Sequence, residues 1–220
     1  VLETLLQLRA RIDLVVVPRG GGGGLQDPSL KLMLQSLGFP VREVDDFEML
    51  SIADCRIVAT PFFGEHCDLD IRGKTTYWIS ISGKRIFVGA DSSGVEPELY
   101  ANIAATIGGT DIAFLGMECD GAPLTWQYGF LFTQPVSRQI SVTRKLSGSN
   151  AAQAMAITQK LGCSEAYVYA MGEEDWVQHV LATNYTPESY QLKQVAEFLS
   201  LCADSGVKAE HLLVRKELCW

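Results

Sequence analysis

The spacing of hydrophobic positions along this chain predicts an alternation of strands and helices. Short unbroken apolar runs that end at Pro or Gly are typical of buried strands. Apolar residues three or four positions apart, between a capping residue and a glycine, are typical of helices. The predicted strands are 13–18, 41–44, 56–61, 76–81, 85–88, 111–116 and 166–171, and the predicted helices are 1–11, 30–37, 96–107, 150–161 and 187–203. One predicted hairpin, at Ser82-Gly83-Lys84, interrupts the alternation. The pattern as a whole predicts a layered α/β fold.

Composition and charge narrow the class of protein. The chain is 47% hydrophobic and 20% charged, which is typical of a globular protein, and it contains no apolar run of the roughly 18–20 residues that span a bilayer. Its net charge of −8 argues against a nucleic-acid-binding face, so we expect neither nucleic acid nor a membrane as partner. Six cysteines without a CxxC pair indicate a reduced, cytoplasmic protein. No repeat or linker divides the sequence, so residues 1–220 are expected to form a single domain.

Three candidate motifs favour a structural interpretation. The run Gly20–Gly24 follows a strand, but it matches no phosphate-binding fingerprint and is expected to be a flexible loop. No GxSxG motif supports a serine nucleophile. Cys119 lies between Glu118 and Asp120, whose negative charges would raise the pKa of its thiol, so we expect a buried or loop cysteine.

A more specific constellation lies in two loops that follow predicted strands. The first contains Glu65, His66, Cys67 and Asp68, and the second contains Asp91 after an apolar run. A carboxylate at the end of a buried strand needs a partner, and a metal ion is one such partner. The alternative is that Asp91 caps the next helix and that the acidic loop is solvated. Taken together, the two loops favour metal binding.

These loops resemble known metal motifs. Phe63-Gly64-Glu65-His66-Cys67-Asp68-Leu69, a hairpin, and Phe87-Val88-Gly89-Ala90-Asp91-Ser92-Ser93-Gly94 are similar to the third and fourth metal motifs of the metallo-β-lactamase superfamily. The resemblance implies an αββα sandwich in which Asp91 bridges two metal ions. The superfamily's first motif, HxHxDH, is absent, because no histidine precedes His66. The motif would fall upstream of Val1, so we expect this chain to be the C-terminal portion of an incomplete sandwich.

The identity of the metal depends on whether Glu65 or His66 is the ligand. Neighbouring residues in an extended chain point to opposite sides, so one of the two is expected to bind. Glu65 with Asp91 resembles the diiron oxygenase branch of the superfamily, which includes an amino-acid β-hydroxylase of chloramphenicol biosynthesis. A carboxylate-rich site suits iron, whereas His66 as ligand would suit a zinc or manganese site.

Residues of the C-terminal half could complete the site. His179 is the candidate for the last histidine ligand of the superfamily, although a position on the face of an amphipathic helix explains it equally well. Trp126, Tyr128 and Arg144 lie in predicted loops and are candidates for substrate contacts.

The sequence leaves three functions open. The favoured hypothesis is an oxygenase with two iron ions that activates dioxygen and hydroxylates an amino acid or acyl substrate, either free or tethered to a carrier protein. Carrier proteins are acidic, and a chain of net charge −8 offers no evident basic surface for one. The second hypothesis is a zinc- or manganese-dependent hydrolase of the same fold, with His66 as ligand. The third is a non-catalytic remnant of the fold that is used for binding.

Overall fold

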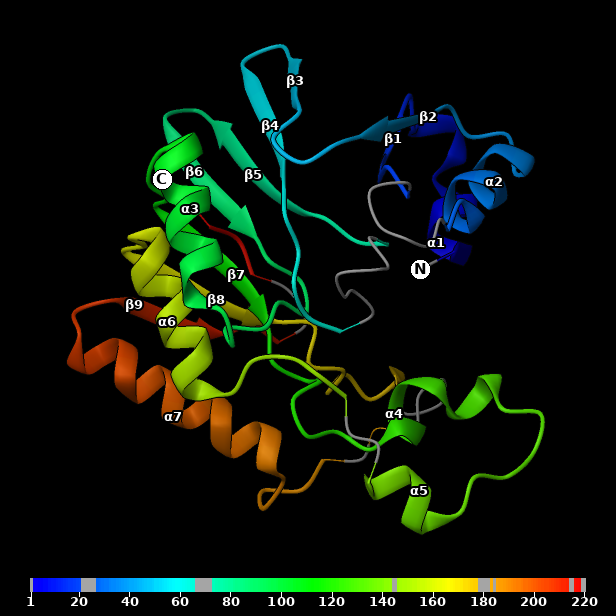
Figure 1. Ribbon diagram of the computed structural model, residues 1–220, viewed down its shortest axis with the longest axis vertical. Helices are drawn as coiled ribbons and strands as arrows, with labels where there is room; N and C mark the ends of the chain where they lie inside the picture. The colour runs from blue at the N-terminus through cyan, green and yellow to red at the C-terminus, as the bar shows by residue number, and fades with distance from the viewer. Residues whose placement is uncertain are drawn as a thin grey trace.

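The computed structural model describes residues 2–20, 27–65, 73–143, 146–177, 183, 185–213 and 216–218. Within these ranges the chain forms a two-stranded sheet, β1-β2, and a seven-stranded sheet in the order β3-β4-β5-β6-β7-β8-β9 (Figure 1). The strands are β1 (Val15–Pro18), β2 (Val41–Val44), β3 (Met49–Ile52), β4 (Cys55–Thr60), β5 (Thr76–Ile81), β6 (Lys84–Val88), β7 (Ile112–Gly116), β8 (Glu165–Tyr169) and β9 (Lys208–His211). The helices are α1 (Leu2–Gln7), η1 (Arg9–Arg11), α2 (Ser29–Ser36), α3 (Pro97–Ile107), α4 (Leu124–Tyr128), η2 (Gly129–Leu131), α5 (Arg138–Thr143), α6 (Ala151–Leu161) and α7 (Tyr190–Asp204).

The large sheet is antiparallel in its first half and parallel in its second. Strands β3 to β6 pair antiparallel with their neighbours in sequence, and β6 to β9 pair parallel. Parallel neighbours need crossover connections, and these contain α3, α6 and α7 in turn. The three helices lie together along one face of the sheet (Figure 1).

The main core lies between this helical layer and the sheet. Phe87 of β6, Ile157 of α6, Val168 of β8 and Phe198 of α7 are all fully buried in one cluster. The ring of Tyr100 meets that of Phe87 edge-on at 6.2 Å, a favourable aromatic geometry. This packing fixes the ends of β6, β7 and β8 relative to one another.

The N-terminal strands form a smaller unit with α1 and α2. Val17, Leu34 and Phe39 are its buried core. A second cluster around Val44 and Leu50 joins the two sheets. The Tyr77 hydroxyl also donates a hydrogen bond across the junction to the carbonyl of Val16, at 3.3 Å. Grouping all 220 residues in a single domain stays a prediction.

Most predicted elements are confirmed within a few residues, and so is the mixed α/β class. Five elements were not predicted: β3, β9 and the short helices α4, η2 and α5. The expected αββα sandwich has two sheets, each covered by helices. Among the described residues, the seven-stranded sheet is covered by one layer of helices, and the small β1-β2 sheet has its own helices α1 and α2. The expected flexible loop Gly20–Gly24 lies outside the described residues except for Gly20. Among the described helices, none has the length and apolar character that a bilayer crossing requires.

Candidate metal centre

One edge of the large sheet collects most of the chemically active side chains. Strands β4 and β6 end there, and β5, antiparallel to both, begins there. Since β7 and β8 run parallel to β6, their carboxyl ends meet at the same edge. The segments that leave these strands contain Glu65, Asp91, Glu118 and Glu173. Rigid strand ends with variable loops are a common platform for binding sites.

The structure brings the two predicted metal loops into direct contact. Gly64 and Ser92 form an isolated antiparallel bridge, and the Ser93 N–H donates to the carbonyl of Phe63 at 2.7 Å. Buried threonines at the ends of β4 and β5 support the first loop, because the Thr60 and Thr76 hydroxyls bond at 2.6 Å. Glu65 and Asp91, 26 positions apart in sequence, therefore lie on adjacent segments.

A third segment holds both loops. The backbone N–H of Ser147 donates to Oε2 of Glu65. Two residues later, the Ser149 hydroxyl donates to the carbonyl of Ser92 at 2.6 Å and accepts from the N–H of Gly94 at 3.1 Å. The loop before α6 thus fixes the Glu65 carboxylate and the Asp91 loop together.

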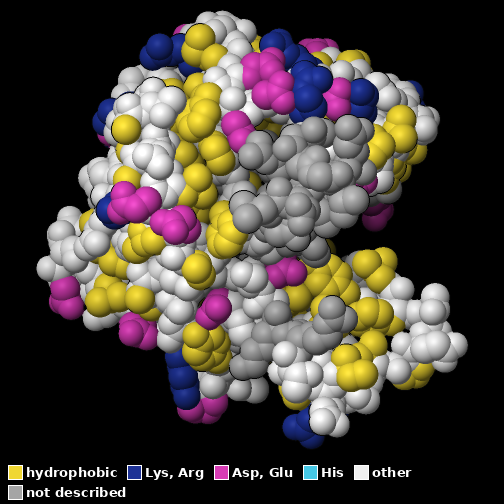
Figure 2. All heavy atoms as spheres, in the orientation of Figure 1, with side chains coloured by type: hydrophobic (Ala, Val, Ile, Leu, Met, Phe, Trp, Pro, Cys, Tyr) yellow, Lys and Arg dark blue, Asp and Glu magenta, His cyan; other side chains and the backbone are white. Residues whose placement is uncertain are grey.

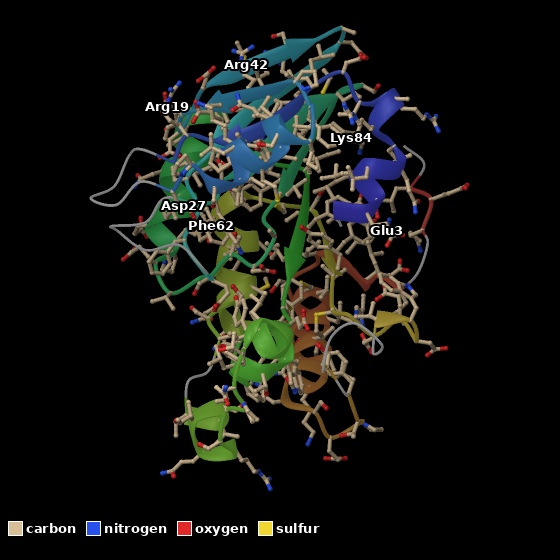
Figure 3. The ribbon with its side chains drawn as sticks, turned by 90° about the vertical axis from the view of Figure 1, so that its right-hand side faces the viewer. Glu3, Arg19, Asp27, Arg42, Phe62 and Lys84 are labelled. Atoms are coloured by element: carbon tan, nitrogen blue, oxygen red, sulfur yellow. The ribbon has the colours of Figure 1, made fainter. Side chains whose placement is uncertain are left out.

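Asp91 faces a cation and does not cap the next helix. Its Oδ2 accepts a hydrogen bond from Nζ of Lys74 at 3.1 Å, and both side chains are about one-third exposed or less. The same ammonium lies 5.2 Å from the centre of the Phe62 ring and makes a cation–π contact with it (Phe62 in Figure 3). The cap of α3 is Glu96, whose side chain accepts from the N–H of Glu98 at 3.3 Å. The helix-cap alternative for Asp91 is therefore wrong.

Backbone geometry at Ala90 turns the chain so that Asp91 leaves the strand. Ala90 has a φ of +47°, which is unfavourable for a residue with a side chain. The Gly116 N–H donates to its carbonyl at 2.7 Å and links the turn to the end of β7. Strained backbone of this kind persists where the surroundings fix it, and it is frequent at functional sites.

Cys119 lies within the same group of carboxylates. Its side chain is buried, and burial is the main cause that raises its pKa; the charges of Asp91, Glu118 and Glu65 raise it further. The prediction of an unreactive, buried cysteine agrees with this environment. Glu118 is also buried, and it accepts a hydrogen bond from the Thr183 hydroxyl at 3.1 Å.

Helix α4 forms a wall beside Glu65. The Tyr128 hydroxyl donates to Oε1 of Glu65 at 3.3 Å. Trp126 packs edge-on against Tyr185 at 5.4 Å and contacts the buried cluster that includes Cys119. Both half-buried aromatic residues lie near the candidate centre, and their contact with a substrate stays a prediction.

Three candidate residues, His66, His179 and Arg144, lie outside the described residues. Over the ranges that the structure describes, no three His, Cys, Asp or Glu side chains gather closely enough to hold a metal ion. The described part of the candidate site thus consists of Glu65 and Asp91. The third histidine of the chain, His211 on β9, lies 2.9 Å from the carboxylate of Glu173.

Sequence analysis missed Lys74 and Ser147. Lys74 lies 17 positions from its partner Asp91, and Ser147 lies 82 positions from Glu65, so no local pattern connects them. Lys74 directly precedes β5, which begins at this edge of the sheet, and a lysine at that position was a detectable signal. The Ser147 contact uses a backbone N–H, for which residue type carries no signal.

Comparisons with known proteins agree with this arrangement. No family model matches the chain. The chain is 41% identical, over 217 residues, to the 4-amino-L-phenylalanyl-[CmlP-peptidyl-carrier-protein] 3-hydroxylase of Streptomyces venezuelae. The match covers 98% of this chain and 41% of the relative, so the chain spans about two fifths of the relative's length.

Solved structures include the same kind of enzyme. The crystal structure of CmlA, a diiron β-hydroxylase from Streptomyces venezuelae, matches with a TM-score of 0.82 at 41% identity, over 96% of this chain and 40% of that one. A more distant match is the metallo-β-lactamase fold protein YhfI from Bacillus subtilis, with a TM-score of 0.49 at 10% identity, over 96% of this chain and 67% of that one. The chain therefore shares the fold of the corresponding part of the hydroxylase.

Proposed function

The chain is a homologue of the CmlA diiron β-hydroxylase, and we propose that it forms part of the metal centre of an enzyme with the same type of reaction. The proposed enzyme uses two iron ions and dioxygen to hydroxylate an aminoacyl group on a peptidyl carrier protein. Such an enzyme is an oxidoreductase of the monooxygenase type.

The bridge between Gly64 and Ser92 is the observation that carries this proposal. It places the carboxylates of Glu65 and Asp91 on adjoining segments at the edge of a rigid sheet. Hard oxygen donors of this kind suit iron, and the ion pair between Lys74 and Asp91 supports a negatively charged Asp91 carboxylate at this position. The donor set of the described residues therefore fits one side of a diiron centre.

Each residue of the centre has a separate role in the proposal. Glu65 and Asp91 would hold the irons. Tyr128 and the Ser147 N–H would orient the Glu65 carboxylate through their hydrogen bonds. When bound, the irons would supply the activation of dioxygen. Trp126 and Tyr128 would form the wall that excludes water from the reacting group.

Metal analysis of the full-length protein tests the proposal. We expect about two irons per chain, an iron charge-transfer absorption band, and hydroxylation of an aminoacyl carrier protein. Glu65→Ala should lower the iron content severalfold, because a ligand is lost. Glu98→Ala is the matched control, since Glu98 is an exposed carboxylate paired with Lys160 on the surface. Its iron content should equal that of the wild type.

The other two hypotheses predict different results in the same experiment. A hydrolase would contain zinc or manganese, show no iron band, and lose its metal in His66→Ala while Glu65→Ala retained it. A non-catalytic remnant would bind no stoichiometric metal in any variant. Either result would overturn the proposed oxygenase.

We also propose a cytoplasmic location. Cys55, Cys119, Cys163 and Cys202 are free thiols, and three of the four are buried. Unpaired cysteines in this number are typical of proteins that stay in a reducing compartment.

A further inference from the structure

The net charge of −8 conceals a strong segregation of charge along the sequence. From Gly121 to Ser164 the chain has no Asp or Glu, although the whole sequence has 26. The same stretch contains four basic residues: Arg138, Arg144, Lys145 and Lys160. This part of an acidic protein is therefore positively charged.

The middle of this stretch forms a lobe of its own, residues 124–143, which contains α4, η2 and α5. Figures 1 and 3 both show α4 and α5 in the lower part of the molecule, and Figure 1 shows them to one side of α7. The Thr125 and Ser141 hydroxyls bond at 2.8 Å and tie α4 to α5. The two helices of the lobe are thus joined by a side-chain hydrogen bond.

The outer surface of this lobe is apolar and cationic. Leu131 is 63% exposed, and Phe132, Ile140 and Val142 are exposed as well. Arg138 begins α5 and has no acidic side chain in its own lobe to pair with. Figure 2 shows hydrophobic side chains and a cationic one on the lobe at the lower right, with no acidic side chain on its outer part. Several exposed apolar residues on one small lobe are typical of interaction sites.

The inner side of the same lobe reaches the candidate metal centre. Tyr128, at the end of α4, donates to Glu65, and Trp126 packs on the cluster that contains Cys119. Helix α4 therefore belongs both to the lobe and to the surroundings of Glu65. A partner on this surface could deliver a flexible tethered group past α4 to the irons.

We propose that the outer surface of residues 124–143 is the docking site for the peptidyl carrier protein. This inference rests on the proposed function for the identity of the partner. Carrier proteins are acidic, so their charge complements a lobe that has Arg138 and no Asp or Glu. The exposed side chains of Leu131, Phe132, Ile140 and Val142 on the same lobe provide apolar area for such an interface.

Direct binding measurements test the docking site without depending on turnover. The affinity of the full-length protein for an aminoacyl-loaded peptidyl carrier protein is measured by calorimetric titration at low and high salt, and iron content is measured in parallel. Arg138→Glu should weaken binding about tenfold at low salt, and the difference should shrink at high salt because salt screens the attraction. The double variant Leu131→Ser, Ile140→Ser should weaken binding about tenfold at both salt concentrations, because apolar contacts are not screened.

The matched control is Arg56→Glu, an exposed arginine on β4. Strand β4 lies far from the lobe in Figure 1, and this variant should bind the carrier protein like the wild type. Wild-type affinity in both lobe variants would overturn the docking site, and so would equal weakening by Arg56→Glu. Hydroxyl-radical footprinting of side chains adds a further check. If Leu131 and Ile140 are already protected in the full-length protein before the carrier protein is added, a different segment or a second copy covers the lobe and the inference is wrong.

The two proposals can fail separately in this experiment. Absence of iron with intact, Arg138-dependent binding would refute the oxygenase and keep the docking site. A full iron content and active enzyme with no effect of the lobe variants would refute the docking site alone.

Discussion

At the scale of single residues, the two predicted metal loops meet at Gly64 with no room for a side chain. A β-carbon there would lie 2.3 Å from the carbonyl oxygen of Asp91 and 3.1 Å from the amide nitrogen of Ser93. Both are backbone atoms, which cannot rotate aside as a side chain can. Gly64→Ala should therefore push the Glu65 loop away from Asp91. We expect a severalfold lower iron content in the full-length protein, and a loss of about 1–3 kcal/mol in its free energy of unfolding.

Gly129→Ala is the control for this effect. Gly129 has a helical φ of −53°, and the nearest atom to an added β-carbon is 3.9 Å away. Alanine fits such a position without strain, so iron content and stability should be unchanged or slightly improved. A Gly64→Ala protein that retains its full iron content would show that the two loops do not act together on the metal.

Residue type identified Glu65 and Asp91 as candidate ligands, but it could not predict which residues contact these two carboxylates. Glu65 and Asp91 were visible because acidic residues directly follow apolar strand patterns. Their contacts with Tyr128, Lys74 and Ser147 depend on which strand ends share an edge of the sheet. That arrangement is set by strand order, which local spacing does not encode.

At the scale of elements, helix α6 holds the loop that contacts both metal segments, and its first turn is closed by a capping box. The Asn150 side chain accepts from the Gln153 N–H at 3.0 Å, and the Gln153 side chain accepts from the Asn150 N–H at 3.1 Å. Asn150→Ala removes the first of these bonds. We expect the free energy of unfolding to fall by about 1 kcal/mol in urea titration.

Asn102→Ala provides the comparison, because Asn102 lies exposed within α3 and caps nothing. Alanine has the higher helix propensity, so this variant should be slightly more stable than the wild type. Equal effects of the two substitutions would mean that the capping box does not stabilise α6.

The elements that sequence analysis missed share a physical property. Strands β3 and β9 are the edges of the large sheet: β3 is apolar but mostly exposed, and β9 contains charged residues. Helices α4 and α5 have five and six residues, too few to show a helical period. In contrast, α3 and α6 have caps and a following glycine, and both were predicted. Apolar runs and capping residues therefore predicted helices and strands reliably. Elements that lack these sequence signals form because of tertiary contacts, which the local sequence does not show.

At the scale of the whole molecule, the averaged properties of the sequence hid its most informative feature. Net charge suggested that no surface suits an acidic partner. The fold gathers a stretch without acidic residues into one lobe and places that lobe beside Glu65. The stretch without acidic residues can be read from the sequence. Its position beside Glu65 can be seen only in the structure.

The stability of the whole molecule should fall at alkaline pH because buried thiols must stay neutral in the fold. Burial raises the pKa of Cys163 from 9.0 to about 12 and that of Cys202 to about 11. In the unfolded chain both thiols ionise near their ordinary pKa. The folded protein binds more protons in this range, so their contribution is complete below pH 9 and is lost as pH rises through 9 towards 11. Each thiol should lower the free energy of unfolding by roughly 1.4 kcal/mol per pH unit above 9.

Urea titrations at a series of pH values, with reductant present, measure this decline in the free energy of unfolding. The double variant Cys163→Ala, Cys202→Ala should show a shallower decline, whereas Cys55→Ala, at a partly exposed position, should follow the wild type. An equally steep decline in the double variant would assign the alkaline loss to other groups.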